Sequence, residues 1–124
     1  MINQYMDMLV ECLEKKNQIL DNLTALNKKQ TELIQNENFS LEEFDKCVDE
    51  KGILIDNILK LDLGFEGLYN KVGKTVADNP SAYKEQLSKM QKLITLLLLR
   101  PDLMRFFSRL NRLSIKALLR SSSA

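Results

Sequence analysis

Two uninterrupted heptad ladders, in which core-type positions recur at alternating steps of three and four residues, constrain the fold of this chain more than any other feature. The first ladder contains Ile2, Tyr5, Leu9, Cys12, Lys16, Ile19, Leu23, Leu26, Gln30 and Leu33. The second contains Leu41, Phe44, Val48, Lys51, Ile55, Ile58, Asp62, Phe65, Tyr69, Val72 and Val76. This spacing keeps one apolar stripe turned toward a partner helix over many turns. The ladders therefore predict long, narrow helices and favour a protein that works by contact along its length.

The short segment between the ladders carries the signals of a helix start. Residues 36–38, with the sequence Asn-Glu-Asn, interrupt the apolar pattern. Ser40 and Glu43 have the spacing of a capping box, and Phe39 and Phe44 have that of a hydrophobic staple. Because so short a turn brings two long helices side by side, the sequence predicts an antiparallel helical hairpin.

The position of the turn also predicts the register of this hairpin. If the turn is centred on residue 39, the numbers of facing residues sum to 78. Lys16 then faces Asp62, and we predict a half-buried ion pair between them; the alternative is that both side chains reach water without touching. Cys12 faces Glu66 in this register and lies far from Cys47, so an intramolecular disulfide is excluded. Cys12 is at a ladder position and Cys47 is beside one, as expected for reduced thiols that pack between helices.

The chain beyond the second ladder predicts a third helix. Gly64, Gly67 and Gly73 weaken the end of the second helix, where we expect fraying, a kink or a close neighbour. Asn79 is the expected N-cap of the third helix and Pro80 its first residue. The apolar residues of the third helix at heptad spacing are Tyr83, Leu87, Met90, Ile94 and Leu97.

The composition changes sharply at residue 100. Residues 1–99 contain 12 Lys and 16 acidic residues and no Arg, whereas residues 100–124 contain five Arg, one Lys and one Asp, a net charge of +5. Pro101 predicts a kink or break, because it removes a helical N–H. After it, an apolar stripe (Leu103, Phe106, Leu110, Leu113, Ala117) lies beside a basic one (Arg105, Arg109, Arg112, Lys116, Arg120).

The predicted fold is therefore all-α, a coiled-coil-like bundle of a long antiparallel hairpin and a third helix, with a kinked or separate C-terminal helix after Pro101. Residues 1–99 form the hairpin and third helix, and residues 100–124 form a basic amphipathic helix that ends in a disordered tail at residues 121–123.

Several functions are excluded by residues that the chain does not contain. It has no His, and its two Cys match no metal-ligand spacing, so we expect no enzyme, no metal site and no cofactor. The N-terminus lacks the basic region of a signal peptide. The longest apolar run, residues 93–99, is far shorter than the ~20 residues of a spanning helix, so we expect a cytoplasmic protein.

Three stretches resemble the FlgN-type flagellar export chaperones of Gram-positive, clostridia-like bacteria. They are residues 5–9 (YMDML) with 13–16 (LEKK), residues 44–51 (FDKCVDEK) with 58–69 (ILKLDLGFEGLY), and residues 83–87 (YKEQL) leading to Leu93 and Ile94. The resemblance covers roughly residues 1–95. It implies a cytosolic helical chaperone that holds hook-associated subunits, its clients, before type III export, and that binds them toward its C-terminal helix.

The leading hypothesis is accordingly that the third helix binds an amphipathic helix of the client. The candidate partner-binding residues are Leu87, Met90, Leu93, Ile94, Leu97, Leu98, Phe106 and Phe107. The alternative is that the residues on the third helix close the core; we expect this for Leu87, Met90, Ile94 and Leu97, and expect Leu93 and Leu98 to bind the partner.

Two other classes of function compete with the chaperone. One is a structural homo-oligomer in which the third helix packs on its copy across a two-fold axis. The other is a membrane-surface protein anchored by the basic segment with Phe106 and Phe107, although we expect no membrane association. We expect no nucleic-acid binding, because the basic stripe is short and the rest of the chain is acidic.

Overall fold

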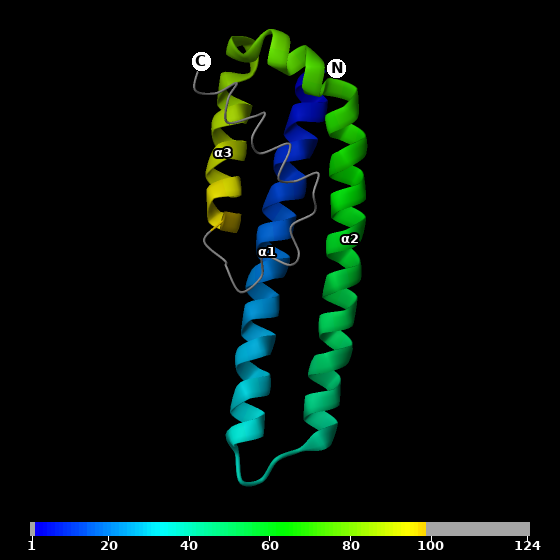
Figure 1. Cartoon of the computed structure of the whole chain (residues 1–124), viewed down its shortest axis with the longest axis vertical. Helices are drawn as coiled ribbons and strands as arrows, with labels where there is room; N and C mark the ends of the chain where they lie inside the picture. Colours follow the sequence, from blue (N-terminus) through cyan, green and yellow to red (C-terminus); the bar gives the residue numbers. More distant parts are fainter. Residues whose placement is uncertain (1, 99–124) are drawn as a thin grey trace.

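The computed structural model describes residues 2–98, which fold into an all-α bundle. Helix α1 spans Ile2–Gln35, α2 spans Leu41–Asp78, the short 3-10 helix η1 spans Pro80–Tyr83, and α3 spans Lys84–Leu98. Figure 1 shows α1 and α2 as a long antiparallel hairpin and α3 as a shorter helix beside α1. The predicted hairpin and third helix are confirmed. The expected C-terminal helix after Pro101 and the expected tail lie outside the described residues.

The turn between α1 and α2 is built as the sequence indicates. The Ser40 hydroxyl accepts a hydrogen bond from the backbone N–H of Glu43 at 3.3 Å, which caps the start of α2. The rings of Phe39 and Phe44 meet edge to face with centroids 5.9 Å apart. Within the turn, the Asn36 side-chain oxygen accepts a bond from the backbone N–H of Asn38 at 3.0 Å. Because the cap and the staple act together, the chain reverses within five residues.

Helix α3 covers only the part of the hairpin farthest from this turn. It packs against α1 and has few contacts with α2, so that α1 lies between the other two helices in Figure 1. Leu93 of α3 lies beside Asn17 of α1, and both helices run toward the turn. Since the end of α3 is only five residues beyond Leu93, it reaches about the level of Asn22. Among residues 2–98, the half of the hairpin nearest the turn consists of two helices.

The core follows this division of the hairpin. Its buried apolar residues are Met6, Leu9, Val10, Leu13, Leu20, Leu23, Ile58, Phe65, Val72, Val76, Leu87, Met90, Ile94 and Leu97. On α1, the last of them is Leu23. Near the turn, two residues of the second ladder are exposed: Leu41 by 63% and Val48 by 48%. The ladder pattern alone predicted an inward position for both, and this is wrong because no third helix within residues 2–98 covers that end.

The start of α3 differs from the expectation that Asn79 caps it directly. The chain first forms η1, and no backbone N–H bonds to the Asn79 side chain in the described structure. Instead, the Ser81 hydroxyl donates to the Asn79 side-chain oxygen at 3.2 Å. Pro80 lies at the first position of η1, where its missing N–H has no effect. The tighter 3-10 turn lets the chain reverse before α3 begins at Lys84.

The glycines near the end of α2 do not interrupt it, although Figure 1 shows its last turns bent across the end of the hairpin toward α3. We expect Gly67→Ala to raise the free energy of unfolding by up to about 1 kcal/mol, because a Cβ there meets nothing within 4 Å and alanine favours the helix. A Cβ at Gly73 would lie 3.1 Å from the Tyr69 ring, so Gly73→Ala should give a smaller gain or a loss. Urea unfolding of the two variants would measure this, and equal gains would show that the ring moves without cost.

Candidate functional site

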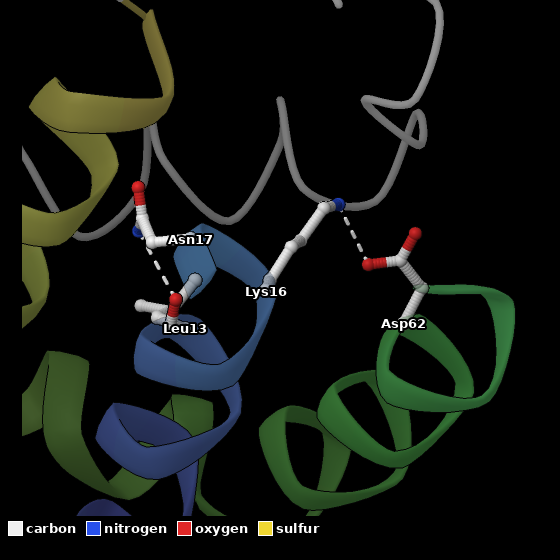
Figure 2. A network of polar contacts seen from close by, with 4 residues as sticks. All are labelled: Leu13, Lys16, Asn17 and Asp62. Atoms are coloured by element: carbon white, nitrogen blue, oxygen red, sulfur yellow. Dashed lines mark hydrogen bonds and ion pairs between the residues drawn. The ribbon is translucent and has the colours of Figure 1, made fainter. Parts of the chain in front are cut away.

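A buried ion pair fixes the register of the hairpin. The Lys16 ammonium lies 2.8 Å from a carboxylate oxygen of Asp62, and the two side chains are only 2% and 14% exposed. Figure 2 shows the Lys16 side chain extended from α1 to Asp62 on α2. Burial lowers the pKa of Lys16, and the hydrogen bond that its ammonium donates to Asp62 opposes this shift. The predicted pair is confirmed, and its contacts are those of a structural element.

A second polar residue, Asn17, ties α3 to α1. Its amide nitrogen donates to the backbone oxygen of Leu13 at 3.0 Å and to that of Leu93 at 3.2 Å. In Figure 2 Asn17 points to the other side of α1 from Lys16, toward α3. Its side-chain oxygen is buried and has no hydrogen-bond partner within residues 2–98. Asn17 thus positions α3 by its hydrogen bond to the Leu93 backbone oxygen, in an interface between α1 and α3 that is otherwise apolar.

The candidate partner-binding residues on α3 mostly face the core. Leu87 is 3% exposed, Ile94 is 2% exposed, and both Met90 and Leu97 are fully buried. Leu93 is half-buried and packs against the same core. Leu87, Met90, Ile94 and Leu97 are thus buried in the core, as the alternative interpretation of the third helix expected. A partner that binds the described structure does not reach these four side chains. The Leu98 side chain and the whole of Phe106 and Phe107 lie outside the described residues.

An apolar groove runs along the hairpin on the face away from α3, and we call it the open groove. It is bordered by two series of residues at seven-residue spacing: Cys12, Ile19, Leu26 and Leu33 on α1, and Cys47, Leu54, Leu61 and Leu68 on α2. All are half-buried except Cys47, which is buried. Leu26 lies on the opposite side of α1 from Asn17, because nine residues make about two and a half turns. The residues that border the groove on α1 therefore extend over about 30 Å, on the side of α1 opposite to Asn17.

Two adjoining hollows mark the middle of the open groove. The first, of about 380 Å³, is lined by Asn22, Ala25, Leu26, Glu50, Ile53 and Leu54. The second, of about 390 Å³, is lined by Lys15, Gln18, Ile19, Asn22, Asn57, Lys60 and Leu61. Both share Asn22, and Ile53 is 62% exposed at the rim. Each hollow combines apolar residues with polar or charged ones, an arrangement that suits one face of an amphipathic helix.

Two cysteines border the open groove. Burial is the main cause of the raised pKa of the Cys12 thiol, so the reactive thiolate is disfavoured. The two cysteines, both in the described part of the chain, are not joined by a disulfide. Cys47 is buried and Cys12 is half-buried, whereas the ladders placed Cys12 deeper. Within residues 2–98, no three His, Cys, Asp or Glu side chains gather as ligands for a metal ion.

The α2 side of the open groove was not predicted from the sequence. The signal was present, because Cys47, Leu54, Leu61 and Leu68 repeat every seven residues beside the second ladder. Such a series widens the apolar stripe of the helix, so that part of the stripe is not covered by the partner helix. The same widening on α1 comes from ladder residues such as Ile19 and Leu26, which the pattern placed inside the hairpin.

No helix in the described range 2–98 is both long and apolar enough to span a membrane. In comparisons with known proteins, no protein-family model, no curated protein and no solved structure matched the chain.

Proposed function

We propose that this chain is a cytoplasmic export chaperone of the FlgN type, which holds a hook-associated flagellar subunit by an amphipathic helix of that client. The observation that carries the proposal is the open groove, whose bordering residues extend over about 30 Å of the hairpin and which contains two adjoining hollows. A client helix of about 20 residues matches this length. The sequence resemblance supplies the class of client.

The geometry changes the surface on which the client is proposed to bind. The family resemblance and the apolar sequence of α3 favoured the third helix, but Met90 and Leu97 are fully buried. The open groove offers apolar residues that are only half-buried, so a client helix gains apolar contact without displacing α3. Its polar rim, with Lys15, Lys60 and Glu50, leaves the charged face of the client helix in water.

An aspartate in the groove is expected to weaken client binding by at least about 10-fold, equivalent to 1.4 kcal/mol. Ile53→Asp is the most suitable variant, because Ile53 lines the first hollow yet is 62% exposed, so its replacement spares the core. Leu63→Asp is the matched control: Leu63 is 69% exposed on the same helix and lines neither hollow. Co-purification with hook-associated subunits, followed by light scattering for stoichiometry, would measure both.

Two results would contradict the proposal in different ways. If the full chain forms no complex with any hook-associated subunit, the function is wrong. If it forms one that Ile53→Asp leaves intact, the chaperone function stands and the groove is not its binding surface. Self-association of the unbound chain that Ile53→Asp abolishes would instead assign the groove to a second copy.

A further inference from the structure

The turn end of the hairpin exposes a second apolar surface, which we call the tip surface. It consists of Ile34, Phe39, Leu41 and Val48, which are 63%, 45%, 63% and 48% exposed. Ile34 has the same heptad position as Met6, Leu13 and Leu20 on α1, which are buried where α3 covers the hairpin; Asn27 lies between Leu20 and Ile34 in this series. Leu41 and Val48 belong to the ladder that faces α1. The tip surface thus consists of apolar residues at core-type positions that no other described helix covers.

The charge around the tip surface is strongly negative. Residues 32–50 contain seven acidic residues and one lysine, a net charge of −6. The acidic side chains at positions 32, 37, 42, 43, 45, 49 and 50 are all exposed. A second copy of this end would bring the same negative charge against it, which opposes a symmetric contact between two tips. The surface therefore fits an apolar segment with positive charge.

We propose that residues 100–120 of this same chain bind the tip surface. They carry an apolar stripe that includes Leu103, Phe106 and Leu110, and a basic stripe of four arginines and one lysine beside it. Residues 100–124 have a net charge of +5, which complements the −6 of residues 32–50. No other segment of the chain combines an apolar stripe with several arginines, because all five Arg follow residue 99.

The geometry of α3 makes this contact reachable. α3 runs toward the turn and stops at about the level of Asn22. From Asn22 to the end of α1 at Gln35 the distance is about 20 Å, at 1.5 Å per residue. A segment of 21 residues spans about 30 Å even when it is fully helical, so residues 100–120 reach the tip surface from the end of α3 without reversing direction.

The contact gives the two faces of the hairpin separate roles. The tip surface continues the side of the hairpin that α3 covers, and the open groove lies on the other side. Residues 100–120 therefore complete the third layer of the bundle while the proposed client groove stays accessible. The inference does not depend on the identity of the client.

Hydrogen–deuterium exchange on the full chain tests the proposal. The test variant is Arg105→Glu/Arg109→Glu/Arg112→Glu, and the control is Lys74→Glu/Lys84→Glu/Lys92→Glu, which makes the same change in net charge at exposed sites away from the tip. We expect amides of residues 30–50 to exchange at least about 5-fold faster in the arginine variant and at the wild-type rate in the control. Adding Asp45→Lys/Asp49→Lys to the arginine variant should restore slow exchange, and high salt should weaken the wild-type protection.

Three outcomes would overturn the proposal. Equal exchange of residues 30–50 in the wild type and the arginine variant means that these arginines do not hold the segment on the tip. Protection that rises with protein concentration, together with a doubled mass in light scattering, assigns the contact to the segment of a second copy. Binding to phosphatidylserine–phosphatidylcholine vesicles that the arginine variant loses, with unchanged exchange at the tip, assigns the segment to a membrane surface.

Discussion

Replacing Asp62 with alanine is expected to lower the free energy of unfolding by about 3–5 kcal/mol, the range for removing one partner of a buried ion pair. The variant removes the carboxylate 2.8 Å from the Lys16 ammonium, which is 2% exposed, and so removes negative charge that compensates the burial of this ammonium. Urea unfolding followed by circular dichroism would measure the change. Asp56→Ala is the control, because Asp56 is exposed on the same helix and its removal should change stability by less than about 0.5 kcal/mol.

A double replacement separates the charge effect from the loss of packing. Lys16→Met with Asp62→Leu removes both charges and keeps apolar volume, so the double variant should be as stable as the wild type or more stable. A loss of less than about 1 kcal/mol in Asp62→Ala would contradict the buried pair, since that is the value of an exposed ion pair.

The pH dependence of the Asp62→Ala variant gives a second readout of the same pair. Burial lowers the folded-state pKa of Lys16 below its ordinary value of 10.5, and the Asp62 hydrogen bond partly offsets that. Between the folded and unfolded pKa values the unfolded chain binds more protons, so the contribution of Lys16 to stability rises with pH in that window. Without Asp62 the pH range between the folded and unfolded pKa values of Lys16 widens. The difference in free energy of unfolding between the wild type and Asp62→Ala should therefore shrink as the pH approaches 10.5.

Replacing Met90 with alanine should destabilise the protein by about 2–5 kcal/mol, because it leaves a cavity at a fully buried position between α3 and α1. Thermal unfolding would measure the loss. Leu96→Ala on the same helix is the matched control: Leu96 is 49% exposed, and its truncation should cost much less.

The Met90 variant also distinguishes the two interpretations of the third helix. If Met90 closes the core, the loss of stability appears in the isolated chain, without any client. An isolated Met90→Ala chain as stable as Leu96→Ala would instead mean that α3 is not packed on α1 in solution, and would return Met90 to the candidate client-binding residues.

The hairpin was predictable because its signals are local. The cap at Ser40, the staple of Phe39 with Phe44 and the two ladders act within a few turns of chain, and their combination gives the register that pairs Lys16 with Asp62. Each of these features is present in the structure. A short turn between long helices leaves few other arrangements.

The extent of α3 and the two exposed surfaces were less predictable, because burial depends on where a distant helix ends. Val48 and Ile58 belong to the same ladder, yet Val48 is 48% exposed and Ile58 is buried. Heptad spacing shows that both turn toward a neighbour but not whether a third helix covers the seam. The open groove was missed for a related reason, since residues that border it have the same spacing as residues in the core.

The buried oxygen of Asn17 affects the order in which the helices separate. Within residues 2–98 this oxygen has no hydrogen-bond partner; such a buried atom costs about 1–3 kcal/mol, and the cost ends when α3 moves off and water reaches the oxygen. α3 is also the shortest α-helix among the described residues. Its release should therefore precede opening of the hairpin, so that the weakest point of the fold is the seam between α1 and α3. A protease would accordingly cleave the released α3 segment while the hairpin is still folded.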